Sequence, residues 1–294
     1  MAGSAPSNPF DPDAGAPRAE PGSGPTDPLA VSGALLHQRM VRDLLPGATP
    51  PSFSFAALTR RPDQVGLDAE RLAALGPAAP PIGPLVVPDA VAPVTDPVSL
   101  ADDPLVVVEG PGLRALGAYR TEGWPHTVER AHLRASVVAR LGRVAAALPE
   151  PLGLAVFDAW RPLPLQAALY DAAYADPELP PGFVAEADPD PSTPPAHLTG
   201  GTVDLTLAHD GIPLALGTPF DDFRSVAHAD HFEHATPFDE RHRVVRDLRR
   251  LLVAAMAAEG FVVLHCEWWH FEHGTRYWAA VTGGEARFGP AALP

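Results

Sequence analysis

The chain has 294 residues, contains no lysine and only one cysteine, Cys266, and carries a formal net charge of −15. An acidic chain without a run of basic residues is a poor match for nucleic acid or for an anionic membrane surface, so we expect neither partner. A single cysteine excludes an intrachain disulfide and a metal site built from several cysteines. We expect Cys266 to be a small buried hydrophobe rather than a nucleophile.

Long apolar runs are also absent, because no stretch is long enough to span a bilayer. The N-terminus lacks the basic segment followed by an apolar segment that is typical of a signal peptide. We therefore expect a soluble, cytoplasmic protein, and the bias toward Ala, Pro and Arg is typical of a GC-rich bacterial genome. Nothing in the sequence indicates the oligomeric state.

Proline divides the chain into regions of different character. Residues 1–28 are rich in Pro, Gly and Ser, and we expect a disordered tail. Residues 29–99 form a proline-rich extension with short helices predicted at 29–45 and 68–76. We favour a tail or linker for this extension over an arm that packs on the catalytic domain or on a partner. Residues 100–294 are the predicted catalytic domain.

From residue 100 onward, predicted strands and helices do not alternate regularly. This order predicts an α+β fold with a central, mostly antiparallel sheet flanked by helices. Runs rich in β-branched residues predict strands, and amphipathic periodicity predicts helices. The strands are expected at 104–108, 153–157, 202–207, 261–265 and 268–272, and the helices at 127–148, 163–175 and 238–259.

His197 and Asp204 flank Gly200-Gly201 at the start of a predicted strand. Asp204 alternates with Val203 and Leu205, so its carboxylate lies on the opposite strand face from these apolar side chains. A buried carboxylate needs a partner, and a metal ion can be that partner. An exposed strand face is an equally good interpretation of this segment taken alone.

Glu267-Trp268-Trp269-His270 supplies a second carboxylate and a second imidazole. Three neutral or anionic ligands with one open position are typical of a catalytic zinc site, and an unbound carboxylate nearby is its usual general base. Residues three apart on a flat strand face opposite sides. For Glu267 and His270 to face one metal, the chain must bulge or turn at the two tryptophans, which we expect to be packing residues.

Arg161 follows a predicted buried strand and precedes Pro162, where we expect a helix to begin. An arginine at a strand end can stabilise an oxyanion in a cleft. The alternative is a salt bridge to Asp158 or to another acidic side chain.

Taken together, four blocks over residues 103–292 resemble the VanX-type D-alanyl-D-alanine dipeptidases, zinc D,D-peptidases that carry His-x-x-Gly-x-x-x-Asp and Glu-x-x-His. The resemblance implies an α+β fold of the Hedgehog/D,D-peptidase type. The matching blocks are 157–162 with Gln166, 197–207, 217–223 and 260–271.

The resemblance also implies roles for individual residues. It makes His197, Asp204 and His270 the ligands of one zinc ion per chain. It makes Glu267 the catalytic base and Arg161 the group that stabilises the oxyanion. The residues expected beside the substrate are Tyr119, Asp158, which orients Arg161, Asp221, which faces a substrate ammonium, and Trp269.

The sequence departs from the family at positions near the expected substrate. Relatives carry Ser where this chain has Pro195 and Leu198, and an Asn-Arg pair where it has Leu248-Arg249. Losing a hydrogen-bonding group from a small polar pocket changes specificity strongly. Zinc-dependent chemistry on a peptide-like bond is therefore better supported than D-Ala-D-Ala as the substrate.

We expect a zinc metallopeptidase that hydrolyses D-Ala-D-Ala or a similar small dipeptide. The alternatives are a D,D-carboxypeptidase or other cell-wall (peptidoglycan) peptidase, a relative that acts on another small amide in secondary metabolism, and a non-enzymatic domain with a structural zinc. His228, His231 and His234 are spaced three apart. We favour a solvent-exposed loop for them over the active-site rim or a second metal site.

Overall fold

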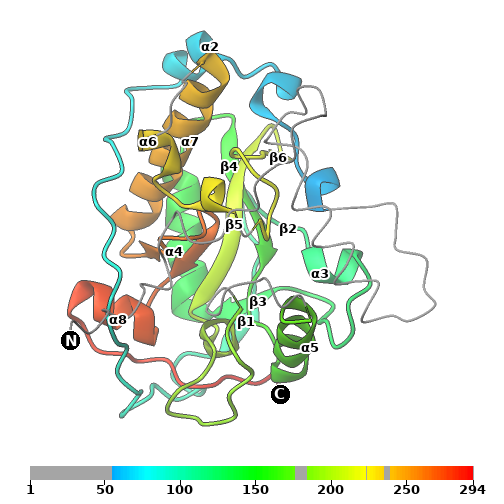
Figure 1. Ribbon diagram of the computed structural model, residues 1–294, viewed down its shortest axis with the longest axis vertical. Helices are drawn as coiled ribbons and strands as arrows, with labels where there is room; N and C mark the ends of the chain where they lie inside the picture. Colours follow the sequence, from blue (N-terminus) through cyan, green and yellow to red (C-terminus); the bar gives the residue numbers. More distant parts are fainter. Residues whose placement is uncertain (1–54, 176–183, 223, 235–238, 294) are drawn as a thin grey trace, which may run out of the picture.

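The computed structural model describes residues 55–175, 184–222, 224–234 and 239–293 (Figure 1). The predicted tail at 1–28 and the predicted helix at 29–45 lie outside these residues. Within the described ranges, no helix is long and apolar enough to cross a membrane.

A six-stranded sheet forms the centre of the molecule (Figure 1). Its strand order is β2-β4-β5-β8-β7, with β6 paired to the end of β5. Of these pairs β2–β4 is parallel and the others are antiparallel, which confirms the predicted α+β fold with a mostly antiparallel sheet. The strands are β2 (Leu113–Ala115), β4 (Leu152–Asp158), β5 (Thr202–His209), β6 (Ile212–Pro213), β7 (Val262–Val263) and β8 (His270–Glu272).

Two long helices, α4 (Ala135–Ala147) and α7 (Glu240–Ala258), pack against each other and against the sheet (Figure 1). Their inner faces are apolar and fully buried, as Leu141 and Leu252 illustrate. The Asp239 side chain caps α7 by accepting a hydrogen bond from the His242 amide. Burial of these faces supplies the main stabilisation of the fold. The remaining α-helices of the domain are α3 (Ala118–Thr121), α5 (Leu163–Ala173), α6 (His231–His234) and α8 (Arg276–Thr282).

The predicted helix over 127–148 is wrong in its first part. Helix α4 begins at Ala135, and the preceding residues form strand β3 (His132–Arg134), which pairs with β1 (Leu105–Val107) in a small second sheet. The Arg134 amide also donates to the Gly200 carbonyl. These contacts with distant segments override the helical periodicity of the sequence.

The described part of the extension, from residue 55 onward, packs on the domain predicted at 100–294. It contains η1 (Phe55–Leu58), η2 (Pro62–Val65) and α2 (Ala69–Ala74), so the helix predicted at 68–76 is confirmed. From α2 the chain then runs down one side of the molecule past α7 and α8 (Figure 1). There Arg276 and Tyr277 of α8 donate hydrogen bonds to backbone carbonyls of residues 86–92. For residues 55–99 these contacts support the arm rather than the favoured tail or linker.

Candidate active site

Three site residues lie in one row across the sheet. Asp158 at the end of β4 pairs with Asp204 on β5, and Asp204 pairs with His270 at the start of β8. His197 reaches the row from η3 (Ala196–Thr199), the one-turn helix before β5. Gly200 follows with a φ of 72°, the left-handed conformation that glycine adopts without strain, and turns the chain into β5.

His197, Asp204 and His270 form a buried cluster whose possible ligand atoms all lie within 4.8 Å of one another. His197 Nε2 is 3.3 Å from Asp204 Oδ2, and His270 Nδ1 is 3.1 Å from Asp204 Oδ1. Asp204 is buried, which excludes the exposed strand face considered from the sequence. The structure therefore brings together the three side chains that the sequence analysis grouped as metal ligands.

In both His197 and His270, the ring nitrogen that faces away from Asp204 has a hydrogen-bond acceptor. His197 Nδ1 lies 2.8 Å from the Ala159 carbonyl, and His270 Nε2 lies 3.0 Å from Glu272 Oε1. With protons on those nitrogens, His197 Nε2 and His270 Nδ1 keep their lone pairs for the centre of the cluster. A second hydrogen-bond partner of this kind is characteristic of histidines that bind metals.

Glu272 was not predicted as a site residue. It is buried, and its other oxygen accepts a hydrogen bond from the Thr275 hydroxyl. Its spacing was the available signal, because residues two apart on a strand share a face and Glu272 follows His270 by two.

The cluster fits a metal cation. Asp204 Oδ1 is buried and, among the described residues, accepts no hydrogen bond, so it is a polar atom in need of a partner. With Glu267 and Glu272 also in the wall, carboxylates dominate the surroundings of His270 and attract positive charge.

Glu267 faces the same cavity as His270 because the chain turns between them. The His270 amide donates to the Glu267 carbonyl, which closes the turn at the two tryptophans that the sequence spacing required. Glu267 Oε2 lies 3.4 Å from His270 Nδ1. Burial raises the pKa of Glu267 to about 8, and a cation bound beside it favours the ionised form instead.

Both tryptophans of this turn are core residues. Trp268 donates its indole N–H to the Thr218 hydroxyl, and the Trp269 ring meets Phe220 edge to face at 5.7 Å. This confirms the expected packing role. Trp269 is completely buried and lies behind the cavity wall, so its position does not support the substrate contact that we predicted for it.

Arg161 is buried at the edge of the cavity with several partners. Its Nε donates to Asp158 Oδ2 at 2.8 Å, and its Nη1 donates to Gln166 Oε1 at 2.9 Å. Its Nη2 lies 3.3 Å from the Tyr119 hydroxyl and 3.7 Å from Asp204 Oδ2. The salt bridge to Asp158 and the cavity-facing position, considered as alternatives from the sequence, are both present.

Tyr119 and Asp221 form the wall next to Arg161. The Tyr119 hydroxyl donates to Asp221 Oδ2 at 2.7 Å. Burial, aided by the charge of Asp204, raises the pKa of Asp221 to about 7. Gln166, which also contacts Arg161, donates its side-chain amide to the Ala185 carbonyl at 2.6 Å. This hydrogen bond fixes the segment around Ala185, which precedes His197, beside the cavity.

A cavity of about 170 Å³ lies among the polar side chains of this site. Its polar lining comes from Tyr119, Arg161, Gln166, His197, Asp204, Asp221, Glu267, His270 and Glu272. Beside the polar groups, its apolar lining comes from five small or aliphatic side chains. They are Leu169, Val184, Ala185, Ala196 and Leu264.

The residues that depart from the family pattern do not line this cavity. Pro195 immediately precedes η3, and Leu198 is buried outside the cavity lining, with its carbonyl accepting the Trp160 indole N–H. Leu248 is fully buried in α7, and the Arg249 guanidinium donates to backbone carbonyls of the 216–228 segment. These substitutions therefore affect the packing behind the site.

The histidines at 228–234 do not all lie in an exposed loop, as we had favoured. His228 and His231 are half-buried, and burial lowers the pKa of both, whereas the His234 side chain is 77% exposed. Within the part of the chain that the structure describes, they do not form a cluster able to hold a metal. Cys266 is buried, as expected, and burial raises the pKa of its thiol.

The chain is similar to known D-alanyl-D-alanine dipeptidases. The family model described as D-ala-D-ala dipeptidase matches residues 128–281. A D-alanyl-D-alanine dipeptidase of Synechocystis is 29% identical over 175 residues, which are 50% of this chain and 71% of that protein. One of Escherichia coli is 33% identical over 138 residues, which are 47% of this chain and 63% of that protein.

The matched range contains the row across the sheet, both histidines of the cluster, Glu267 and Arg161. Because the family model covers more than half of the chain, the chain belongs to the D-ala-D-ala dipeptidase family of metallopeptidases.

Proposed function

We propose that the protein is a zinc-dependent dipeptidase that hydrolyses D-Ala-D-Ala or a similarly small dipeptide. The observation that carries this proposal is the convergence of the His197–Asp204–His270 cluster, Glu267 and Arg161 on one small cavity. A structural metal site needs neither a spare buried carboxylate nor an arginine beside it, so this arrangement favours an enzyme.

In this proposal one zinc ion is held by His197 Nε2, the Asp204 carboxylate and His270 Nδ1, the atoms that face the centre of the cluster. When bound, the ion supplies a Lewis acid that polarises the scissile carbonyl and promotes ionisation of water. Imidazole and carboxylate ligands suit zinc.

Glu267 is the proposed general base and acid. Its carboxylate accepts the proton of the attacking water and then gives it to the leaving nitrogen of the cleaved bond. The turn between Glu267 and His270 holds Glu267 Oε2 at 3.4 Å from His270 Nδ1. In this proposal Glu267 lies beside the zinc ligands and is not one of them.

Arg161 and Asp221 are assigned to the substrate. Arg161 keeps its guanidinium at the cavity edge through Asp158 and Gln166, where it can stabilise the negative charge that develops on the carbonyl oxygen. Asp221 supplies a carboxylate for the substrate ammonium. Tyr119 contacts both groups and fixes their separation.

The size of the cavity supports a small substrate. Its volume of about 170 Å³ lies below the ~300–1,000 Å³ of typical pockets for larger ligands. The names of the two relatives point to D-Ala-D-Ala, and the small apolar lining residues suit methyl side chains.

The proposal is tested with purified full-length protein and a panel of D-Ala-D-Ala, L-Ala-L-Ala, D-Ala-L-Ala and a tripeptide ending in D-Ala-D-Ala. We expect release of free alanine from D-Ala-D-Ala that a chelator abolishes and zinc restores. Preference for the tripeptide indicates a carboxypeptidase instead. Absence of metal-dependent hydrolysis for every peptide contradicts the dipeptidase proposal.

A further inference from the structure

Phe55 belongs to the extension, more than seventy residues before the range that the family model matches. It is nevertheless a core residue, with 2% of its surface exposed. Its ring meets the Tyr119 ring edge to face at 5.6 Å and the Phe220 ring at 5.0 Å. Edge-to-face pairs at these separations restrict the position of both rings.

Of the two rings that Phe55 contacts, Tyr119 lines the active-site cavity, and Phe220 lies next in sequence to the lining residue Asp221. Tyr119 joins the cavity through its hydroxyl, which donates to Asp221 and lies within hydrogen-bond distance of Arg161. The Arg161 guanidinium also lies over the Tyr119 ring, 5.0 Å from its centroid. Phe220 immediately precedes Asp221, which has a φ of 58°, a strained value for a residue other than glycine. Packing around this segment must hold that conformation.

Backbone hydrogen bonds fix the chain just after Phe55. The Arg60 amide donates to the Pro213 carbonyl at 2.8 Å, and the Ala215 amide donates to the Arg60 carbonyl at 2.9 Å. Residue 60 is thus attached beside the end of the central sheet, five residues from Phe55. This attachment limits how far the Phe55 ring can move.

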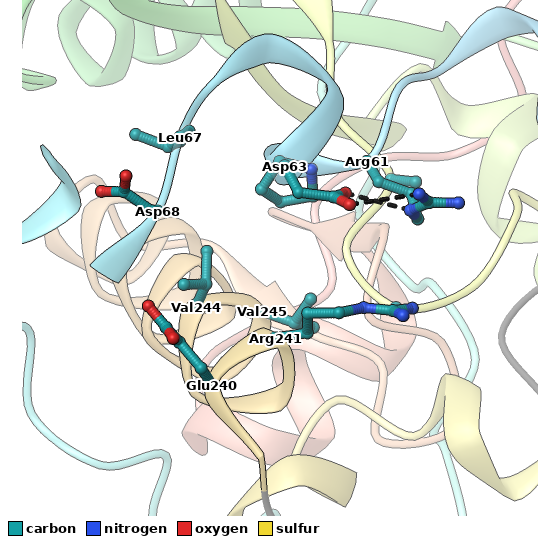
Figure 2. A pocket seen from close by; sticks show the side chains of 11 residues that line it. Arg61, Asp63, Leu67, Asp68, Glu240, Arg241, Val244 and Val245 are labelled. Carbon is teal, nitrogen blue, oxygen red and sulfur yellow. Dashed lines mark hydrogen bonds and ion pairs between the residues drawn. The ribbon is translucent and has the colours of Figure 1, made fainter. Parts of the chain in front are cut away.

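The extension also contacts α7 through η2 and α2, beside the pocket that Figure 2 shows. Leu67 of the extension and Val244 and Val245 of α7 line the same pocket, of about 260 Å³, and an ion pair joins Arg61 and Asp63 at its upper side. Leu67 is as deeply buried as Phe55. It does not line the catalytic cavity, so the extension has one anchor at the active site and one away from it.

We propose that the extension completes the active site, with Phe55 as a positioning residue that holds Tyr119 against Arg161 and Asp221. This inference rests on the proposed function for its catalytic consequence. Phe55 touches no reacting atom. It removes freedom from the Tyr119 ring, whose hydroxyl sets the separation between the oxyanion-stabilising arginine and the ammonium-binding carboxylate.

The test compares Phe55→Ala, Phe55→Leu and Leu67→Ala in the full-length protein. Leu67→Ala is the matched control, because it removes an equally buried side chain of the same extension away from the cavity. We expect Phe55→Ala to lower kcat about tenfold with zinc content unchanged. Phe55→Leu should recover part of this loss, whereas Leu67→Ala should lower Tm to a similar extent and leave kcat within twofold of the wild type.

A second readout does not depend on activity. Protein labelled with 3-fluorotyrosine gives a 19F resonance for Tyr119, which Tyr119→Phe identifies. We expect this resonance to shift or broaden in the Phe55 variants and to stay unchanged in Leu67→Ala. If Phe55→Ala does not fold, the comparison uses Phe55→Leu.

An unchanged Tyr119 resonance in a folded Phe55 variant overturns the positioning role. So does an equal loss of kcat in Phe55→Ala and Leu67→Ala. A wild-type protein that hydrolyses none of the dipeptides contradicts the proposed function instead, and the resonance then still decides whether Phe55 positions Tyr119.

Discussion

Arg161 and Asp158 form an ion pair across three residues at the end of β4, with Arg161 Nε 2.8 Å from Asp158 Oδ2. Both side chains are largely buried, so the pair is shielded from the solvent that weakens exposed pairs. Asp158 thereby holds one edge of the guanidinium, while Gln166 and Tyr119 contact its Nη1 and Nη2 atoms at the cavity.

Arg161→Lys is expected to lower kcat/KM by about 10²–10³-fold. A lysine keeps the charge but cannot contact Asp158, Gln166 and the substrate at once, because it lacks the planar fork of the guanidinium. The measurement is steady-state kinetics on D-Ala-D-Ala with zinc content determined in parallel. Activity near that of the wild type contradicts the role given to Arg161.

Glu267→Gln is expected to lower kcat by about 10²–10⁴-fold while zinc stays bound. The amide preserves the shape of the side chain but cannot accept the proton of water. Cys266→Ala is the neighbouring control, because this buried thiol has no part in the proposed chemistry. Full activity of a zinc-loaded Glu267→Gln variant removes Glu267 from the mechanism.

Glu272→Gln is expected to weaken zinc binding by about 10–100-fold. The carboxylate accepts a hydrogen bond from His270 Nε2 and favours the tautomer whose Nδ1 lone pair faces the ligand cluster. Competition with a chromophoric chelator measures the affinity. The exposed Glu285→Gln should bind zinc as the wild type does, and equal affinities for both variants contradict the role of Glu272.

Removal of zinc by a chelator is expected to lower Tm, and excess zinc should restore it. A ligand that binds only the folded state stabilises it by about 2.7 kcal/mol at a hundredfold excess over Kd. His197→Ala should lose most of this response, because it lacks one of the three donors. A Tm that is independent of zinc in the wild-type protein contradicts a metal at this cluster.

Glu122→Gln is expected to change how stability depends on pH. Burial raises the pKa of Glu122 from 4.5 to about 8 in the folded protein. The folded state therefore binds a proton that the unfolded state releases above pH 4.5, and the stability present at low pH is lost as pH rises toward 8. The slope is at most ~1.4 kcal/mol per pH unit.

The glutamine has no proton to lose, so its stability relative to the wild type should increase between pH 5 and 8. Urea denaturation at several pH values measures this difference. Parallel pH profiles for the two proteins contradict a neutral Glu122.

Local patterns were sufficient for the central elements of this fold. Short strand-like runs predicted β4 and β5, which are buried along most of their length, and amphipathic periodicity predicted α7, which buries one face. The resemblance to the D-alanyl-D-alanine dipeptidases implied the grouping of His197, Asp204 and His270, and the structure places their side chains together.

Features that depend on contacts between residues far apart in the sequence were not predictable from local patterns. Strand β3 exists because β1 pairs with it, and Trp269 lies in the core because Phe220 packs against it. Phe55 gave no signal, since a single aromatic residue in a proline-rich segment does not indicate its partners. Its contacts with Tyr119 and Phe220 join positions more than sixty residues apart.

The row of Asp158, Asp204 and His270 occupies paired positions on three neighbouring strands, so its dimensions equal the spacing of the strands themselves. The separation of these three positions cannot change without moving the backbone of the sheet. Divergence of substrate preference is therefore expected in the surrounding segments, such as residues 184–196 and 217–222. Replacing such a segment with that of a relative should change which peptide is hydrolysed and leave the zinc affinity equal to that of the wild type.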